Sequence, residues 1–188
     1  KALDMIDECN RLREENGLEP LKVSETALAM AMVQANYAAN GHYGHNYQYE
    51  NTGENLAWGP SDWDPYDGWY TAEKANYDAA VKSGDYPDLA GLSAYDISLK
   101  YPDLYQKIGH YLNIISPDYT ATGMAYSGYG ANKYSHGFSQ EFFNEWNSYN
   151  KNDTVYDAAV YRTMVENYVN GVRNAQSTYD AALKKVDE

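Results

Sequence analysis

Two glutamates and a few histidines in apolar surroundings are the residues of this sequence best suited to chemistry. Glu54 lies in the stretch GENLAWG, between a glycine and an asparagine and just before an apolar run. His42 and His45 lie shortly upstream, and Glu73 and His110 lie downstream in equally apolar company. Imidazoles and carboxylates together suffice for a metal site or for general acid/base chemistry. We therefore predict a cleft of histidine and glutamate side chains with Glu54 in its wall.

The same residue types leave several roles open. Two histidines would bind zinc or another divalent cation only weakly, although they would leave coordination positions for water. A glutamate would then orient each imidazole by accepting a hydrogen bond from the ring N–H that does not bind the metal. Alternatively, histidine–glutamate pairs simply hold the loops of the cleft together. Nucleophilic catalysis is not predicted, because no serine or cysteine stands in a recognisable activating context, and Cys9 lies on the apolar stripe of a predicted helix.

Composition narrows the class of partner. The 188-residue chain has a formal net charge of −13, and binding to nucleic acid needs a basic face, so no nucleic-acid partner is expected. One cysteine excludes an internal disulfide. No run approaches the roughly 18 apolar residues of a transmembrane segment. Tyrosine is strongly over-represented, with 21 Tyr against 3 Phe, which favours surfaces that contact glycans or proteins.

The elements that must position these side chains are predicted from periodicity and end signals. Helices are expected at residues 2–16, at 24–40 with Ser24 as N-cap, and from Pro65 to about Lys82. Residues 41–62 read as loop and short extended pieces, and 83–108 as an irregular excursion. Trp69, Glu73 and Tyr77 share one face of the third helix, so Glu73 needs a partner if that face is buried.

Two strands and a long helix complete the predicted elements. Ala121–Tyr126 and Tyr134–Phe143 flank a glycine-containing loop and should pair as antiparallel neighbours. From about Asp153 to the end, apolar residues recur every seven positions, which predicts a long helix that Gly171 could bend or split. It could fold back on the domain, pair with a second copy or form a stalk. We favour packing or a stalk, because a coiled coil with alanine at many of its heptad core positions would be weak.

Several short patterns occur together in a specific order and spacing. They are NRLREENGLEPL, GHYGHN, GENLAWG, WYTAEKANY and GHYLNIISPDY. Over roughly residues 1–145 the chain resembles the CAP superfamily of cysteine-rich secretory, antigen 5 and pathogenesis-related proteins (SCP-like extracellular proteins), in its bacterial form without disulfides. The resemblance implies an α+β fold, an α/β/α sandwich with a small antiparallel sheet between helix layers. We expect a CAP domain at 1–150 and a C-terminal helical extension at 151–188.

The resemblance also implies a shallow cleft lined by two histidines and two acids. By motif, these match His45, Glu54, Glu73 and His110. In some family members the two histidines, here His45 and His110, bind a divalent metal, often zinc. Where the family usually has Thr-Gln after His-Tyr, this chain has Leu112 and Asn113, and a tryptophan that often follows is missing. That segment is linked to sterol binding, so the resemblance does not extend to sterols.

The expected function is therefore binding by a secreted or cell-surface bacterial protein. The cleft would take a small ligand or a divalent metal, and tyrosine-rich loops would contact a glycan, a lipid or a protein. Two alternatives stay open. One is a metal-dependent hydrolase or peptidase with Glu54 or Glu73 as the catalytic acid, and the other is a structural surface module with a vestigial cleft. Neither the ligand nor the oligomeric state can be predicted from the sequence.

Overall fold

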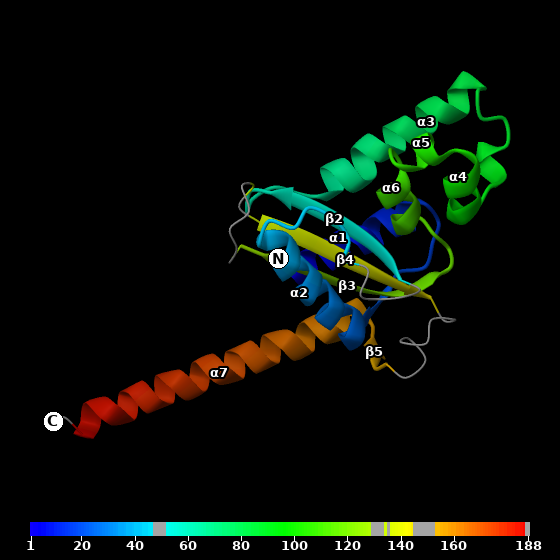
Figure 1. The fold of residues 1–188 in the computed structure, drawn as a ribbon. Coiled ribbons are helices and arrows are strands. Elements are labelled where there is room, and N and C mark those ends of the chain that lie inside the picture. Colours follow the sequence, from blue (N-terminus) through cyan, green and yellow to red (C-terminus); the bar gives the residue numbers. More distant parts are fainter. Residues whose placement is uncertain (47–51, 129–133, 135, 145–152, 187–188) are drawn as a thin grey trace.

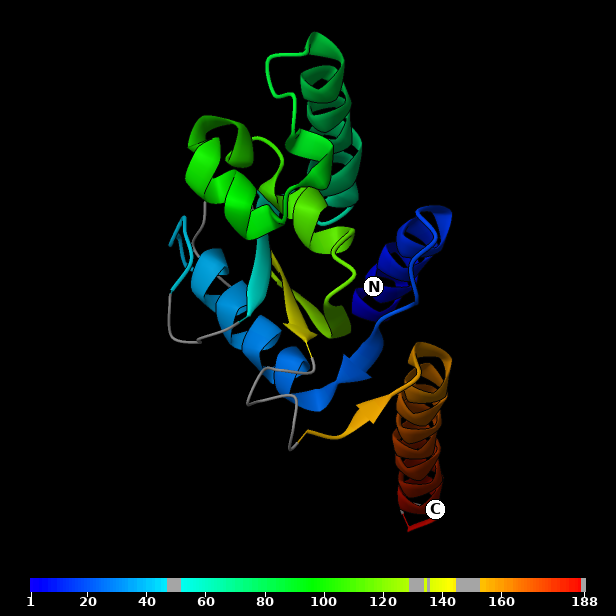
Figure 2. The same cartoon turned by 90° about the vertical axis from the view of Figure 1, so that its right-hand side faces the viewer.

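The computed structural model describes residues 1–46, 52–128, 134, 136–144 and 153–186. A five-stranded sheet lies between helix α2 on one face and helices α1, α3 and α6 on the other (Figures 1 and 2). The predicted α+β sandwich is therefore confirmed. The helices are α1 (Ala2–Glu15), α2 (Glu25–Ala39), α3 (Glu73–Ser83), α4 (Ala94–Lys100), α5 (Pro102–Tyr105), α6 (Gly109–Ile114) and α7 (Ala158–Val186). The strands are β1 (Lys22–Ser24), β2 (Gly53–Gly59), β3 (Tyr119–Ser127), β4 (His136–Asn144) and β5 (Val155–Tyr156).

The strand order in the sheet is β2-β4-β3-β1-β5. β3 and β4 pair antiparallel, as predicted, and β2 pairs antiparallel with β4 along its whole length. The sheet is nevertheless mixed rather than purely antiparallel, because β1 runs parallel to β3. Parallel neighbours need a long crossover connection, and here all the elements from α2 to α6 lie between β1 and β3 in the chain. GENLAWG, which lies in the region predicted as loop and short extended pieces, is the edge strand β2.

Helix α2 lies directly on the sheet because two glycines let the backbones approach. A Cβ atom on Gly123 of β3 would lie 2.1 Å from the backbone nitrogen of Leu28, and one on Gly137 of β4 would lie 2.8 Å from the carbonyl oxygen of Ala35. At the start of α2, the hydroxyl of Ser24 accepts a hydrogen bond from the backbone N–H of Ala27 at 2.9 Å, as predicted for an N-cap. α2 is thereby fixed on the sheet, and its C-terminal end leads into the loop that carries His45.

The main core fills the space between the other face of the sheet and helix α1. It contains Ile6 and Cys9 of α1, Trp69, and Phe138 and Phe142 of β4, all buried. Cys9 is completely buried, and this burial raises the pKa of its thiol to about 11. The prediction that Cys9 is an inert core residue agrees with this environment.

Arg13 of α1 is buried without a carboxylate partner among the described residues. Its guanidinium donates hydrogen bonds to backbone carbonyl oxygens of Glu19, Ile114, Ser116 and Tyr119. Desolvation lowers its pKa. By binding the end of α6 and the start of β3 together, Arg13 fixes the place of Tyr119, which lines the cavity described below.

The region predicted as one helix from Pro65 is helical from Tyr66 to Ser83, but its first part is wound as a π-helix. A π-helical turn (η1, Asp67–Ala72) precedes α3, and the side chain of Asp64 accepts a hydrogen bond from the Tyr66 backbone N–H before it. The wider turn adds a residue to the helical repeat. Trp69 and Glu73 still reach toward α6, so the prediction that they share a side is confirmed.

Residues 84–108 are more regular than predicted. They form a short 3₁₀ turn (Leu89–Gly91), α4 and α5, and pack with α3 and α6 around a second apolar cluster. Its buried members are Ala80, Leu89, Ile97, Leu104, Ile108, Tyr111 and Leu112. The excursion thus extends one helix layer, and Tyr105 from it reaches the cavity described below.

The C-terminal segment is anchored at its beginning and projects at its end. The helix begins at Ala158 rather than near Asp153, because Asp153 interacts with the start of α2 and β5 pairs with β1. Arg162 donates to Asp4 and Asp7 of α1 at 2.9 and 2.6 Å. Further along, Tyr168 is 75% exposed, and α7 extends away from the body without a break (Figure 1). No helix in the described part of the chain is long and apolar enough to cross a membrane.

Candidate functional site

The four residues expected in the cleft form two histidine–glutamate pairs. The Nδ1 atom of His45, in the loop after α2, is hydrogen-bonded to the carboxylate of Glu54 on β2. The Nδ1 atom of His110 on α6 lies 2.6 Å from Oε1 of Glu73, the first residue of α3. Each glutamate side chain is mostly buried, whereas each histidine is more exposed. In each pair the carboxylate holds the imidazole from its buried side.

The pair of Glu73 and His110 is built into the start of α6. The second oxygen of Glu73 accepts a hydrogen bond from the backbone N–H of Tyr111 at 3.0 Å, so it also caps the helix. The ring of Trp69 lies beside that of His110, and its indole N–H donates to the Leu56 carbonyl oxygen at 2.9 Å. Glu73 therefore finds the partner that its position on a buried face required.

The side chain of Asn55 connects this pair to β2. It donates to the carbonyl oxygen of His110 at 3.2 Å and accepts a hydrogen bond from Asn113 of α6 at 2.9 Å. Neighbouring residues of a strand point to opposite faces. Asn55 therefore faces α6, whereas Glu54 faces α2, as does Trp58, which donates to the Ala38 carbonyl oxygen. The side chains of Glu54 and Asn55 therefore leave β2 toward opposite faces of the sheet, and Asn55 links β2 to the helix that carries His110.

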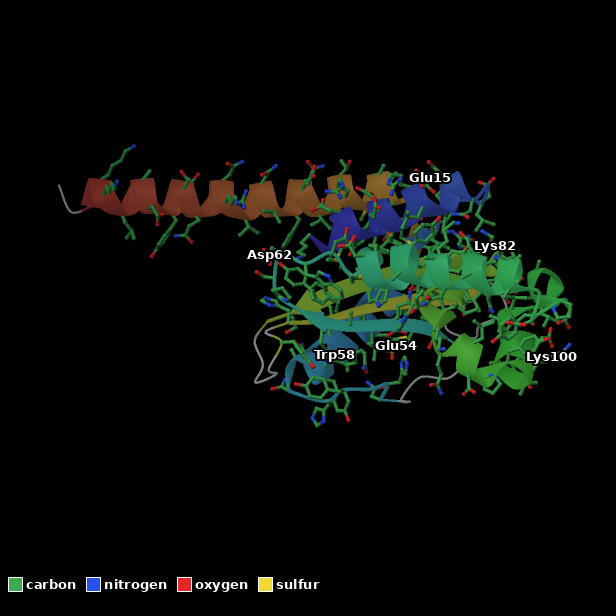
Figure 3. The ribbon with its side chains drawn as sticks, turned by 90° about the horizontal axis from the view of Figure 1, so that it is seen from above. Glu15, Glu54, Trp58, Asp62, Lys82 and Lys100 are labelled. Carbon is green, nitrogen blue, oxygen red and sulfur yellow. The ribbon has the colours of Figure 1, made fainter. Side chains whose placement is uncertain are left out.

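A cavity of about 270 Å³ opens at this edge. Its lining residues are His45, Asn46, Thr52, Gly53, Glu54, Tyr105, Asn113 and Tyr119. Of the four predicted residues, His45 and Glu54 line it, whereas Glu73 and His110 are not among its lining residues. Figure 3 shows Glu54 at the edge of β2, on the side of the molecule away from α7.

Two tyrosines give the cavity hydroxyl groups that stay protonated. Burial raises the pKa of Tyr119 to about 12, and burial together with the negative charge of Glu73 raises the pKa of Tyr105. The Tyr119 hydroxyl packs so closely on Gly53 that a Cβ atom there would lie 2.3 Å from it. The cavity thus combines hydroxyl, amide, imidazole and carboxylate groups within a small space.

Sequence reasoning missed Glu141, which lies opposite Glu54 in the β2–β4 pairing and is completely buried. Burial, followed by the hydrogen bond and the negative charge of Glu54, raises the pKa of Glu141 to about 10. The signal in the sequence was an acid between a glutamine and two phenylalanines of a predicted strand. A charged residue in such a run has to be paired or neutral.

Sequence reasoning also passed over three other side chains. Asn113 follows His110 by three residues, so both lie on one side of a helix, and that spacing could have pointed to it. Tyr105 and Tyr119 come from an excursion and a strand end. Only tertiary structure brings those two to the cavity.

The described histidine and acidic side chains do not form a metal site with three protein ligands. Within the described ranges, no group of three or more His, Cys, Asp or Glu side chains is placed to hold a metal ion. His42 is exposed and stacks on Tyr37 with ring centroids 3.9 Å apart. His136 stacks on Tyr126. His45 and His110 therefore stay the histidines to consider for a cation.

Comparison with models of protein families identifies a family for this chain. A family model described as CAP, the cysteine-rich secretory protein family, matches residues 6–144. The match covers well over half of the chain, from within α1 to the end of β4, and includes both histidine–glutamate pairs. No curated protein matches the sequence.

Proposed function

The chain belongs to the cysteine-rich secretory protein (CAP) family, and we propose that it is a binding module whose cavity at the β2 edge takes a small polar ligand. The observation that carries this proposal is the lining of the cavity. Hydrogen-bond donors and acceptors from four separate parts of the chain converge there: the loop after α2, β2, the α5–α6 region and the start of β3. Convergent polar groups in a concave site are typical of specific small-molecule binding.

The size and charge of the cavity limit the ligand. Its volume of about 270 Å³ is just below the range of about 300–1,000 Å³ for drug-sized ligands. Glu54 supplies a carboxylate, and no lysine or arginine is among the lining residues that the structure describes. A neutral or cationic polar molecule of modest size fits this lining better than an anion or a sterol.

A divalent cation such as zinc is the second candidate. In both pairs the Nδ1 atom of the imidazole is hydrogen-bonded to a glutamate. Carboxylates orient metal-binding histidines in the same way, and this supports a cation site. His45 and His110 alone would hold such a cation weakly. Calorimetric titration with zinc chloride would test this. Heat in the wild type that disappears in the His45→Ala, His110→Ala double variant would support it, and no heat in the wild type would exclude it.

An extracellular location is part of the same proposal. Its support is the family itself, which is described as one of secretory proteins. The tyrosine-rich surface would then contact a glycan, a lipid or another protein outside the cell. Immunodetection in the culture medium and cell-surface fraction of the source cells would support this placement. Detection only in the cytosolic fraction would contradict it.

Ligand-observed NMR with a defined panel of monosaccharides, amino acids and small amines tests the binding role. At least one compound class should bind the wild type and lose binding in His45→Ala. His42→Ala is the matched control, because His42 is an exposed histidine of the same loop outside the cavity. If His45→Ala and His42→Ala bind the compound equally well, the binding site does not include His45. If an ester or peptide panel were instead turned over, and turnover were lost in Glu54→Gln, the hydrolase alternative would replace binding.

A further inference from the structure

The carboxyl groups of Glu54 and Glu141 lie side by side on the face of the sheet that α2 covers. The two residues are directly opposite each other in the β2–β4 pairing, and directly opposed side chains lie on the same face. On the neighbouring strand β3, Gly123 pairs with Glu141 and faces the backbone of α2. Glu141 is completely buried, whereas the side chain of Glu54 is 12% exposed and reaches the cavity.

One oxygen of Glu141 needs a proton. Oε1 accepts a hydrogen bond from the Ser139 hydroxyl at 3.3 Å, but Oε2 is buried and receives no hydrogen bond from a donor among the described residues. An ionised carboxylate left in that state would be costly. A protonated carboxyl group has an O–H to donate, and the neighbouring Glu54 carboxylate can accept it. The strongly raised pKa of Glu141 agrees with this arrangement.

Among the described residues of α2, β2 and β3, none has a positive charge that would favour the ionised form of Glu141. From Thr26 to Ala39, helix α2 has no charged side chain, and β3 has none. Glu54 is the only charged residue of β2, and its charge opposes the ionisation of Glu141. Tyr37, the one titratable residue in that stretch of α2, is exposed and stacks on His42. Glu54 is thus the group with which Glu141 shares its proton.

We propose that Glu141 is a positioning residue that keeps its proton and donates it to Glu54 in a hydrogen bond, so that Glu54 presents one fixed carboxylate to His45 and to the cavity. His45, Glu54 and Glu141 then form a chain of hydrogen bonds from the protein surface to the core. The cavity contains a single negative charge from the two acids. The consequence for ligand binding rests on the proposed function, whereas the protonation itself is independent of any ligand.

Infrared spectroscopy of the ligand-free protein tests the protonation. At pH 7 the wild type should have the carbonyl band of a protonated carboxylic acid, and Glu141→Gln should lose it. Gln is matched in shape and keeps an N–H donor. Absence of the band in the wild type, or its persistence in Glu141→Gln, would overturn the inference. Because no ligand is used, this result is separable from a failure of the proposed binding function.

The nitrogen chemical shifts of the His45 ring test the positioning role. Glu141→Gln should keep them close to those of the wild type, because the amide still donates to Glu54. Glu141→Leu should move them, because Glu54 then lacks its donor and interacts differently with His45. Circular dichroism checks that both variants are folded. If Glu141→Leu does not fold, wild-type shifts in Glu141→Gln still support the role. Shifts that change in Glu141→Gln, or that stay unchanged in a folded Glu141→Leu variant, would contradict it.

Discussion

Glu73 and His110 are joined by a hydrogen bond of 2.6 Å between Oε1 and Nδ1, and the other oxygen of Glu73 binds the backbone next to His110. One side chain therefore fixes both the ring of His110 and the first turn of α6. From this helix Asn113 reaches β2 and the cavity. The pair of Glu73 and His110 thus holds the helix that carries Asn113, while His45 and Glu54 line the cavity themselves.

Replacing Glu73 with glutamine should destabilise the protein. The neutral amide loses a charge-assisted hydrogen bond in a mostly buried position, which is expected to cost about 1–3 kcal/mol. Chemical denaturation measures the change. Asp78→Asn is the matched control on the same helix, because its ion pair with Lys74 is exposed and should contribute less than about 0.5 kcal/mol. Equal effects of the two substitutions would contradict the role given to Glu73.

Replacing Glu141 with glutamine should stabilise the protein increasingly as the pH rises. Glu141 has its pKa raised from 4.5 to about 10 in the folded protein, so folding keeps a proton that the unfolded chain releases. Wild-type stability therefore falls between these two pH values, by at most about 1.4 kcal/mol per pH unit from this group. Glutamine does not titrate. The difference between variant and wild type should be smallest below pH 4.5 and grow toward alkaline pH.

Denaturant titrations of both proteins at several pH values from about 4 to about 9 would measure this difference. A difference that stays constant over the whole range would mean that Glu141 does not keep its proton on folding.

Replacing Gly123 with alanine should be severely destabilising. The added methyl group would overlap the backbone of α2 at Ala27 and Leu28, which cannot move away as a flexible side chain could. Overpacking of this kind costs about 1–3 kcal/mol or more. Gly91→Ala is the control, since an added Cβ atom there would meet nothing within 4 Å and its backbone is not left-handed. Thermal denaturation should distinguish the two variants clearly, and similar melting temperatures would contradict the close packing of α2.

Two truncations separate the anchored part of the C-terminal segment from the projecting part. A chain ending at Asn167 keeps β5 and the contacts of Arg162 with α1, so its melting temperature should match that of the full chain. A chain ending at Asn150 also loses Asp153, which interacts with Ser24 and Thr26 at the start of α2. It should melt at a lower temperature. A large loss in the first truncation would mean that the end of α7 belongs to the core.

Local patterns predicted α1, α2, α3, most of α7 and the β3–β4 pairing, because these depend on periodicity and on short motifs. The four residues of the two pairs came from the resemblance to the family, and which histidine binds which glutamate was not predicted. The N-cap at Ser24 and the buried Cys9 follow from nearest neighbours in the chain. The motif GENLAWG pointed to Glu54, which lines the candidate cavity. The prediction of loop and short extended pieces for residues 41–62 did not locate the strand β2, because an edge strand of mixed polarity gives a weak periodic signal.

The rest depends on contacts between distant segments. Glu141 becomes the neighbour of Glu54 only through the strand register, and Tyr119 reaches the cavity only because Arg13 ties its backbone to α1. The predicted start of α7 was too early, because Asp153 is held by α2 rather than by its own helix. That the side chains of Glu54 and Asn55 point to opposite faces of the sheet follows from strand alternation, which requires knowing that GENLAWG is a strand.

The most direct test of the binding role is the amide NMR spectrum of the ¹⁵N-labelled protein during titration with the panel of monosaccharides, amino acids and small amines. Binding at the β2 edge should move the resonances of Thr52, Glu54 and Asn113 first and in a saturable manner. Those shifts should be lost in His45→Ala and kept in His42→Ala. If no amide moves with any compound, or if the moving amides lie away from the β2 edge, the cavity is not the binding site that we propose.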